Sequence, residues 1–140
     1  MEELIHARPV IPGEAEGMLM VSSEPLSFWG GYDQQTGEII DRRHPLSGRI
    51  AAGHVLALPF TRGSSTTTAV LLEAVRVGVA PAALLSTGVD TCFALASIVA
   101  KELYARSLPV LVLRRQDFDA LASGPSAAIM RDGKIILSKS

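Results

Sequence analysis

The sequence predicts an α/β domain of 140 residues. Short apolar segments separated by glycine and proline fill its first half, a pattern typical of strands joined by loops. From about Ser65, apolar residues recur at helical spacing and alternate with short apolar runs, which indicates helix-strand units. An Asp-Gly pair near the C-terminus signals a closing hairpin. We therefore expect a single domain over residues 1–140.

Four short strands are expected in the first half, at residues 5–11, 17–21, 38–40 and 53–58. Residues 22–48 form a long connection rich in turn-forming residues. Long ordered loops in compact domains are often functional, so this connection is a candidate site.

A first helix is expected from about Ser65, with Gly78 as its C-cap. Its apolar face carries Val70, Leu71, Ala74, Val75 and Val77, while Glu73 and Arg76 lie on the opposite face. A short buried strand follows at residues 81–85.

Asp90 is the expected N-cap of a longer helix that runs to about Arg106. The spacing predicts polar residues outward and aliphatic residues inward. The outward set is Ser97, Lys101 and Glu102, and the inward set is Leu95, Ile98, Val99 and Leu103. A strand buried on both faces (109–113), a short helix (117–122) and a hairpin turn (131–134) complete the expected elements.

Composition argues against several functional classes. The net charge is -1, and no dense cluster of Lys and Arg is present, so nucleic acid is not an expected partner. The acidic, proline-broken N-terminus lacks the features of a secretory signal, and no apolar run reaches the ~20 residues that span a bilayer. We expect a cytoplasmic protein that does not associate with membranes. Cys92 is the only cysteine, which excludes an all-cysteine metal or iron-sulfur site within this chain.

A cluster of hydroxyl residues follows Arg62 and Gly63 at the start of the first expected helix: Ser64, Ser65, Thr66, Thr67 and Thr68. Helix-start N–H groups, a glycine and an arginine together provide the parts of an anion site. An ordinary N-cap explains the serines equally well from the residues alone. The spacing matches neither a P-loop nor a nucleophile elbow. The three histidines, His6, His44 and His54, lack catalytic or metal-binding spacing and are expected on the surface or in structural hydrogen bonds.

Several motifs, in order, resemble the small subunit of the aconitase X family, from about residue 5 to residue 112. They are Gly13-Glu14-Ala15-Glu16-Gly17, Ser27-Phe28-Trp29-Gly30-Gly31, Asp33 with Thr36-Gly37, His44-Pro45-Leu46 with Gly48, Arg62-Gly63-Ser64-Ser65, and Ala80-Pro81-Ala82. The resemblance implies a swivelling β/β/α domain similar to the mobile fourth domain of aconitases and isopropylmalate isomerases.

In that superfamily the large subunit holds the iron-sulfur cluster, and the swivel domain closes over it with a serine base and substrate contacts. The resemblance thus implies an aconitase X large subunit as partner, with no cofactor bound by this chain alone. The single Cys92 agrees with this division.

By motif match, Ser64 is the expected catalytic base. The expected contacts to a small carboxylate or phosphate substrate are Arg62, Gly63, Ser65, Thr66, Phe28, Trp29, Gly30 and Gly31. Phe28 and Trp29 have an alternative interpretation as a hydrophobic staple under the loop. Asp33 has an ordinary interpretation as an Asx-turn and His44 as a surface histidine; neither is expected to be catalytic, and Glu14 and Glu16 have no assigned role. Aconitases follow the Ser-Ser pair with Arg-Glu, whereas Thr66 and Thr67 follow here, which argues against citrate.

The implied activity is that of a hydro-lyase, with cis-3-hydroxy-L-proline as the favoured substrate because the chain is rich in Ala, Arg and Leu and poor in lysine. A phosphomevalonate dehydratase small subunit is the alternative within the family. A non-catalytic swivel or ligand-binding module, such as a phosphohistidine carrier, is the alternative outside it, although none of the histidines lies in a glycine-rich helix start. A stand-alone enzyme has least support, because the chain lacks a partner for the serine and ligands for a cluster.

Overall fold

A computed structural model describes residues 2–61 and 66–138. The strands form one mixed sheet in the order β1-β8-β7-β3-β4-β5-β6-β2. In chain order the elements are β1 (Glu2–His6), β2 (Arg8–Ile11), β3 (Ala15–Val21), β4 (Val55–Ala57), α1 (Thr66–Val77), β5 (Ala83–Ser86), α2 (Thr91–Tyr104), β6 (Val110–Val112), α3 (Arg115–Asp119), β7 (Ser126–Ile129) and β8 (Lys134–Ser138).

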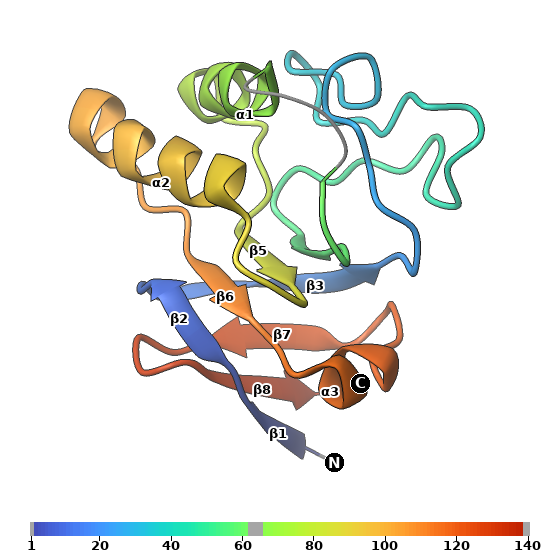
Figure 1. Cartoon of the computed structure of the whole chain (residues 1–140), viewed down its shortest axis with the longest axis vertical. Helices are drawn as coiled ribbons and strands as arrows, with labels where there is room; N and C mark the ends of the chain where they lie inside the picture. The colour runs from blue at the N-terminus through green and yellow to red at the C-terminus, as the bar shows by residue number, and fades with distance from the viewer. Residues whose placement is uncertain (1, 62–65, 139–140) are drawn as a thin grey trace.

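The elements stack in three layers, with α1 and α2 above the parallel strands β3 to β6 and the antiparallel strands β7, β8 and β1 below them (Figure 1). Successive side chains on the middle strands point to opposite faces. On β3, Leu19 packs into the core between the two strand layers, whereas Met20 packs into the core under the helices. This alternation explains why both Val110 and Leu111 on β6 are buried, as the unbroken apolar run predicted. The α/β fold class is confirmed.

The two ends of the sheet are joined by the first strands of the chain. The sheet begins with β1 and ends with β2, and only Ala7 separates these strands in sequence. β1 pairs antiparallel with β8, and β2 pairs antiparallel with β6 (Figure 1). The segment predicted as one strand over residues 5–11 is therefore divided between two strands, and each lies in a different strand layer.

Residues 38–40 do not form the predicted strand. They make only isolated bridges, Glu38 with Ile50 and Ile39 with Tyr32. The connection turns too sharply for a ladder, since Gly37 and Gly48 both adopt left-handed conformations, with φ of 80° and 83°. The connection is nevertheless anchored by buried side chains, namely Leu26, Phe28, Tyr32, Ile39, Leu46 and Ala51.

The end of α1 agrees with the prediction. Gly78 has φ 86°, its N–H donates to Val75 O at 3.1 Å, and the Val79 N–H donates to Ala74 O at 2.8 Å. This pair of bonds is a Schellman motif, which requires a left-handed residue after the helix. The short helix and the closing hairpin are confirmed, although α3 begins at Arg115, two residues before its predicted start.

The orientation predicted for α2 is only partly right, because Lys101 and Glu102 are exposed as predicted but none of the residues predicted to face inward is buried. Ser97 is buried and donates its hydroxyl to Leu108 O, whereas Leu95 and Ile98 are 52% and 51% exposed. The inward face consists of Phe93, Ala96, Ser97 and Ala100. Small residues allow α2 to pack closely against α1 and the sheet, and this requirement outweighs burial of the larger aliphatic side chains. In the part of the chain that the structure describes, no helix is long and apolar enough to span a bilayer.

Candidate functional site

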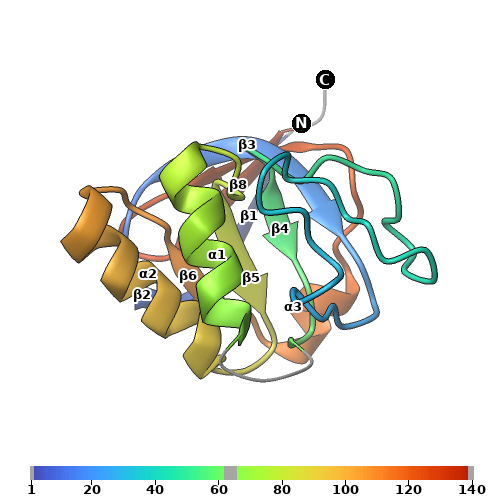
Figure 2. The same ribbon diagram turned by 90° about the horizontal axis from the view of Figure 1, so that it is seen from above.

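The parallel strands bring their carboxyl ends together at one edge of the sheet, where both long helices begin. The arrows of β4 and β5 point towards the end of the molecule at which α1 and α2 start (Figure 2). Helix N-termini carry unpaired N–H groups and a partial positive charge. In open α/β sheets, ligands bind in the crevice outside such strand ends. This carboxyl edge is the candidate site.

The four residues with the strongest predicted roles, Arg62, Gly63, Ser64 and Ser65, lie outside the described residues, so their roles stay predictions. The described chain reaches Thr61 after β4 and resumes at Thr66, the first residue of α1. Thr61 and Thr66 are therefore the nearest described residues before and after the motif.

Asp90 connects one of these flanks to α2. Its Oδ2 accepts hydrogen bonds from Thr61 N at 3.1 Å and from Thr61 Oγ1 at 2.6 Å. Its Oδ1 accepts from Cys92 N at 3.0 Å and Phe93 N at 3.1 Å, as a helix N-cap does. The Asp90 carboxylate thus holds Thr61, the residue before the motif, at the N-terminus of α2. Sequence analysis found the cap but not the bond to Thr61, because no local pattern relates residues 29 positions apart.

Part of the hydroxyl cluster is structural. Thr67 and Thr68 are buried, and the Thr68 hydroxyl donates to Cys92 O at 3.3 Å, which joins α1 to α2. Thr66 is half-buried at the start of α1, and its predicted contact with substrate stays a prediction.

The Phe28-Trp29-Gly30-Gly31 segment forms a tight turn with an unequal division of roles. Gly31 N donates to Phe28 O at 3.3 Å, and Gly30 adopts φ 78° within the turn. Phe28 is completely buried, with its ring centroid 5.2 Å from that of Tyr32 and 5.8 Å from that of Phe93. The predicted contact of Phe28 with substrate is therefore corrected: its side chain is in the core, close to the staple interpretation, and it has no exposed surface to offer a ligand.

Trp29, Gly30 and Gly31 remain candidates for contact with substrate. Trp29 is 70% exposed, and Gly30 is open to solvent. Gly31 is buried, and a Cβ there would stand 2.1 Å from Ser27 O, so the turn tolerates only glycine at this position.

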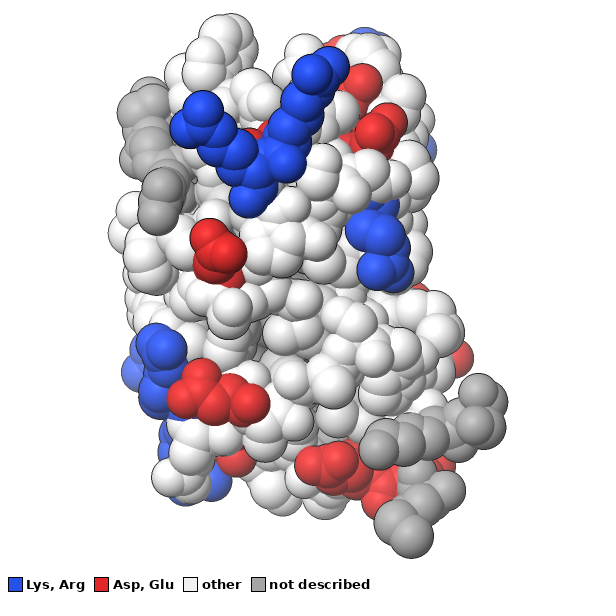
Figure 3. All heavy atoms as spheres, turned by 90° about the vertical axis from the view of Figure 1, so that its right-hand side faces the viewer, with Lys and Arg blue, Asp and Glu red and all other residues white. Residues whose placement is uncertain are grey.

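Three exposed apolar side chains lie, in sequence, within a few residues of Thr61 or of a residue that contacts it, and we call them the apolar rim: Trp29, Phe60 and Val89, which are 70%, 53% and 54% exposed. Thr61 relates all three, because it forms a parallel bridge with Leu26, follows Phe60 and bonds to Asp90. On the face seen in Figure 3, charged side chains lie at the top, at the bottom and along both sides, around a largely uncharged middle. Such a surface suits contact with another protein surface.

Two polar residues of the long connection are structural. Asp33 Oδ1 accepts from Gln35 N at 2.8 Å, which is the Asx-turn interpretation. His44 is buried rather than on the surface, and its Nδ1 accepts from Leu46 N at 3.1 Å. Nε2 therefore carries the proton of the neutral ring and donates to Glu24 O at 3.3 Å.

Tyr32 anchors the same connection to the end of α1. Its hydroxyl donates to Val79 O at 2.8 Å, and burial raises its pKa well above the ordinary value of 10.0. The phenol stays protonated and acts as a donor only.

The described residues do not fit an iron-sulfur cluster or another metal site. No group of three His, Cys, Asp or Glu side chains that could hold a metal occurs within residues 2–61 and 66–138. Cys92 is a single, half-buried thiol near the N-terminus of α2, whereas a cluster requires several thiolates. No step of chemistry is derived through a cluster on this chain.

The layered β/β/α architecture, with its polar loops gathered at one edge, defines a swivel-type domain. The family model described as the aconitase X swivel domain matches residues 4–138, and the chain belongs to that family. The crystal structure of Thermococcus kodakaraensis aconitase X superposes with a TM-score of 0.85 at 27% identity, over 98% of this chain and 99% of that one. The predicted family and swivel fold are confirmed.

The similar proteins differ in how much of their length this chain covers. A cis-3-hydroxy-L-proline dehydratase of Pseudomonas aeruginosa is 47% identical over 136 residues, which are 97% of this chain but 23% of that protein. A dehydratase of the same name from Hypocrea jecorina is 41% identical, over 85% of this chain and 20% of its own length. A phosphomevalonate dehydratase small subunit of Methanothermobacter thermautotrophicus is 38% identical, over 69% of this chain and 73% of its length.

Proposed function

We propose that this chain is the swivel component of an aconitase X hydro-lyase, with Ser64 as the base and cis-3-hydroxy-L-proline as the substrate. The similarity to the Pseudomonas dehydratase, 47% identity across 97% of the chain, is the observation that carries the proposal. Because that relative is much longer, the proposed reaction also needs the part of the enzyme that corresponds to its remaining length.

The serine needs help from its surroundings to act as a base. A serine hydroxyl is far too weak an acid to lose its proton at neutral pH unless N–H donors and cations stabilise the alkoxide. The N–H groups at the start of α1 and the Arg62 guanidinium are of the required type. The Asp90 bonds to Thr61 support this role, since they fix the chain immediately before the motif.

The partner is proposed to be the aconitase X large subunit. It would hold the iron-sulfur cluster, which supplies a Lewis acid for the departing hydroxyl group. The exposed apolar rim of Trp29, Phe60 and Val89 would be covered when the partner closes over the carboxyl edge. Closure of this kind excludes water from the reacting groups.

A second candidate is the small subunit of a phosphomevalonate dehydratase. The observation in its favour is the similarity to that subunit, which is 38% identical over 69% of this chain. The higher identity to the Pseudomonas dehydratase favours the amino acid substrate.

The test is co-expression with the large-subunit gene under anaerobic conditions, followed by assay of both substrates. We expect Ser64→Ala to lower kcat by at least about 10³-fold while the complex still assembles. The matched control is Ser47→Ala, at an exposed position in the long connection, which should leave kcat unchanged. Full turnover by an assembled Ser64→Ala complex would show that the serine is not the base, and turnover by this chain alone would contradict the shared site.

A further inference from the structure

A groove of about 650 Å³ lies at the carboxyl edge of the sheet. It is lined by residues at the junction of β1 with β2 and at the ends of β5 and β6. Arg8 is paired with Val112 in the β2–β6 ladder, which places the start of β2 beside the end of β6. The volume lies within the range of ~300–1,000 Å³ typical of small-molecule sites.

Hydrogen-bond donors dominate the polar lining of this groove, and none of its lining residues is acidic. Arg8 is exposed and makes no ion pair or side-chain hydrogen bond with any residue in 2–61 or 66–138. The Gly88 N–H likewise has no hydrogen-bond partner among the described residues, and Gly88 carries no side chain to shield it. Arg114 also lines the groove and uses Nε to bond Asp117 Oδ2 at 3.2 Å, and its terminal nitrogens make no other ion pair or side-chain hydrogen bond within the described residues.

The remaining wall is apolar. Ala7, Pro9 and Val112 line it, and Pro9 has no N–H to offer. The groove therefore combines a donor-rich end with a surface for a carbon skeleton. Sites for small organic molecules combine apolar walls with a few converging polar groups in this way.

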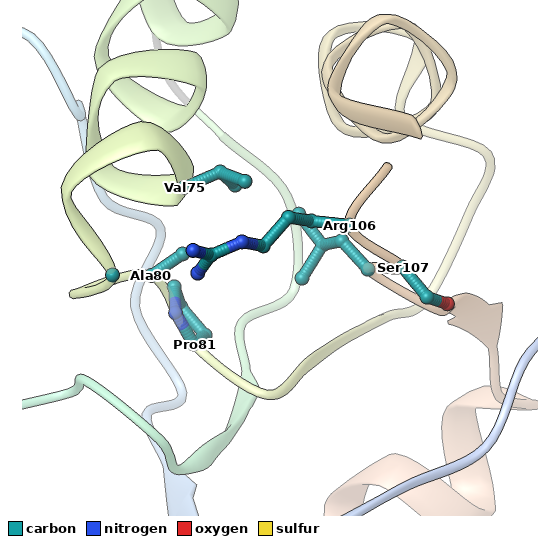
Figure 4. Close-up of a pocket in the computed structure, with 7 residues that line it drawn as sticks. Val75, Ala80, Pro81, Arg106 and Ser107 are labelled. Carbon is teal, nitrogen blue, oxygen red and sulfur yellow. The ribbon is translucent and has the colours of Figure 1, made fainter. Parts of the chain in front are cut away.

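In a smaller pocket elsewhere, an arginine side chain of the protein itself occupies a place next to a helix end. That pocket, about 140 Å³ at the ends of α1 and α2, is crossed by the Arg106 side chain, whose guanidinium lies beside Ala80 and Pro81 (Figure 4). There the arginine fills the space and faces the carboxyl end of a helix, a favourable place for a cation. Arg8 has no such internal partner among the described residues.

We propose that the groove binds a small organic anion, whose carboxylate or phosphate group meets Arg8, the Gly88 N–H and Arg114, with its carbon skeleton against Pro9 and Val112. Charge-assisted bonds from a guanidinium to a carboxylate or phosphate are strong and directional. The proposal rests on the described lining residues of the groove and does not depend on the proposed function. Acidic side chains on another polypeptide would present the same anionic group, and the experiment distinguishes that source from a small molecule.

The experiment is an NMR titration of the ¹⁵N-labelled 140-residue chain at constant ionic strength, with inorganic phosphate, citrate and an Asp-rich peptide as three separate probes. We expect saturable shifts of the Gly88 amide and the Arg8 Nε–Hε group. Arg8→Gln should weaken binding at least about tenfold, and Arg114→Gln about threefold, because Arg114 is already bonded to Asp117. The matched control is Arg106→Gln, which removes the same charge far from the groove and should change affinity less than about twofold.

Each outcome decides the proposal. Saturation by phosphate or citrate supports a free small anion as the ligand, whereas saturation by the peptide alone overturns the small-molecule site in favour of carboxylates on another chain. Shifts that spread over all arginines without saturation, or equal losses from Arg8→Gln and Arg106→Gln, overturn the site. Amide spectra of each variant confirm that it is folded.

Discussion

The two edges of the parallel strands are closed in different ways. At the amino edge, main-chain bonds dominate: Gly53 N donates to Ala80 O at 3.0 Å, and Ala82 N donates to His54 O at 2.8 Å. At the carboxyl edge, side chains add connections to the main-chain bonds: Asp90 bonds to Thr61, and Thr87 donates to Pro59 O both from its N–H at 3.2 Å and from Oγ1 at 3.0 Å. An edge held by main-chain atoms fixes the fold whatever the side chains are. An edge held by side chains can be changed residue by residue, and this is the edge that carries the candidate site.

The largest expected effect contrasts a glycine at each edge. A Cβ at Gly17 would stand 2.3 Å from Gly53 O, a main-chain atom that cannot move aside, whereas a Cβ at Gly88 would meet nothing within 4 Å. We expect Gly17→Ala to lower the free energy of unfolding by about 3 kcal/mol, and Gly88→Ala to change it by less than about 1 kcal/mol. Urea unfolding of both variants measures the difference. Equal effects would show that the two edges do not differ in rigidity.

A smaller effect tests the side-chain connection at the carboxyl edge. Asp90→Ala removes the acceptor of four hydrogen bonds and should cost about 2–3 kcal/mol of stability. Asp90→Asn keeps an oxygen for the helix cap but turns N–H groups towards Thr61, so it should cost about 1–2 kcal/mol.

The control for Asp90 is Asp119→Ala, which removes an exposed carboxylate bonded to Arg115 and should cost less than about 0.5 kcal/mol. Hydrogen exchange of the Thr61 and Phe93 amides provides the local readout. If Asp90→Ala were as mild as Asp119→Ala, or if Thr61 kept its protection, the assigned role of Asp90 would be wrong.

The smallest effect concerns an exposed pair outside both edges. The Arg76 guanidinium bonds the Glu73 carboxylate at 2.6 and 2.8 Å and lowers the pKa of Glu73 from 4.5 to about 2. Because the folded-state pKa is lowered, the contribution to stability is complete above pH 4.5 and is lost as the pH falls towards 2. An NMR titration of the Glu73 carboxyl should show this low midpoint, and Arg76→Gln should raise it towards 4.5. An unchanged midpoint in the variant would rule out Arg76 as the cause.

The sequence predicted the order and type of most elements because their signals are local. The Schellman glycine at Gly78, the Asp90 cap and the Asp-Gly hairpin each depend on a few neighbouring residues. The inward face of α2 was not predicted, because both faces of that helix are apolar, and only the packing of α1 decides that Ala96 and Ala100 face inward. Hydrophobic periodicity ranks faces by side-chain size, whereas close packing of helices favours small residues.

For the candidate site, too, the sequence predicted what depends on neighbouring residues and not what depends on distant ones. The motif of residues 62–65 and its family were recognisable because the residues are contiguous. The bonds that position the site join distant segments, such as Tyr32 to Val79, and leave no periodic signal. Phe28 was expected at the surface beside Trp29, since a sequence cannot show which of two adjacent aromatic residues turns inward.

The position of the first two strands has a consequence for how the chain folds during synthesis. Residues 2–11 are made before their partners, which are β6 at Val110–Val112 and β8 at Lys134–Ser138. At a synthesis rate of ~5–20 residues per second, several seconds or more pass before the partners appear. The β1–β2 segment can therefore pair with neither partner until most of the described chain has been made, although it precedes every other strand in sequence.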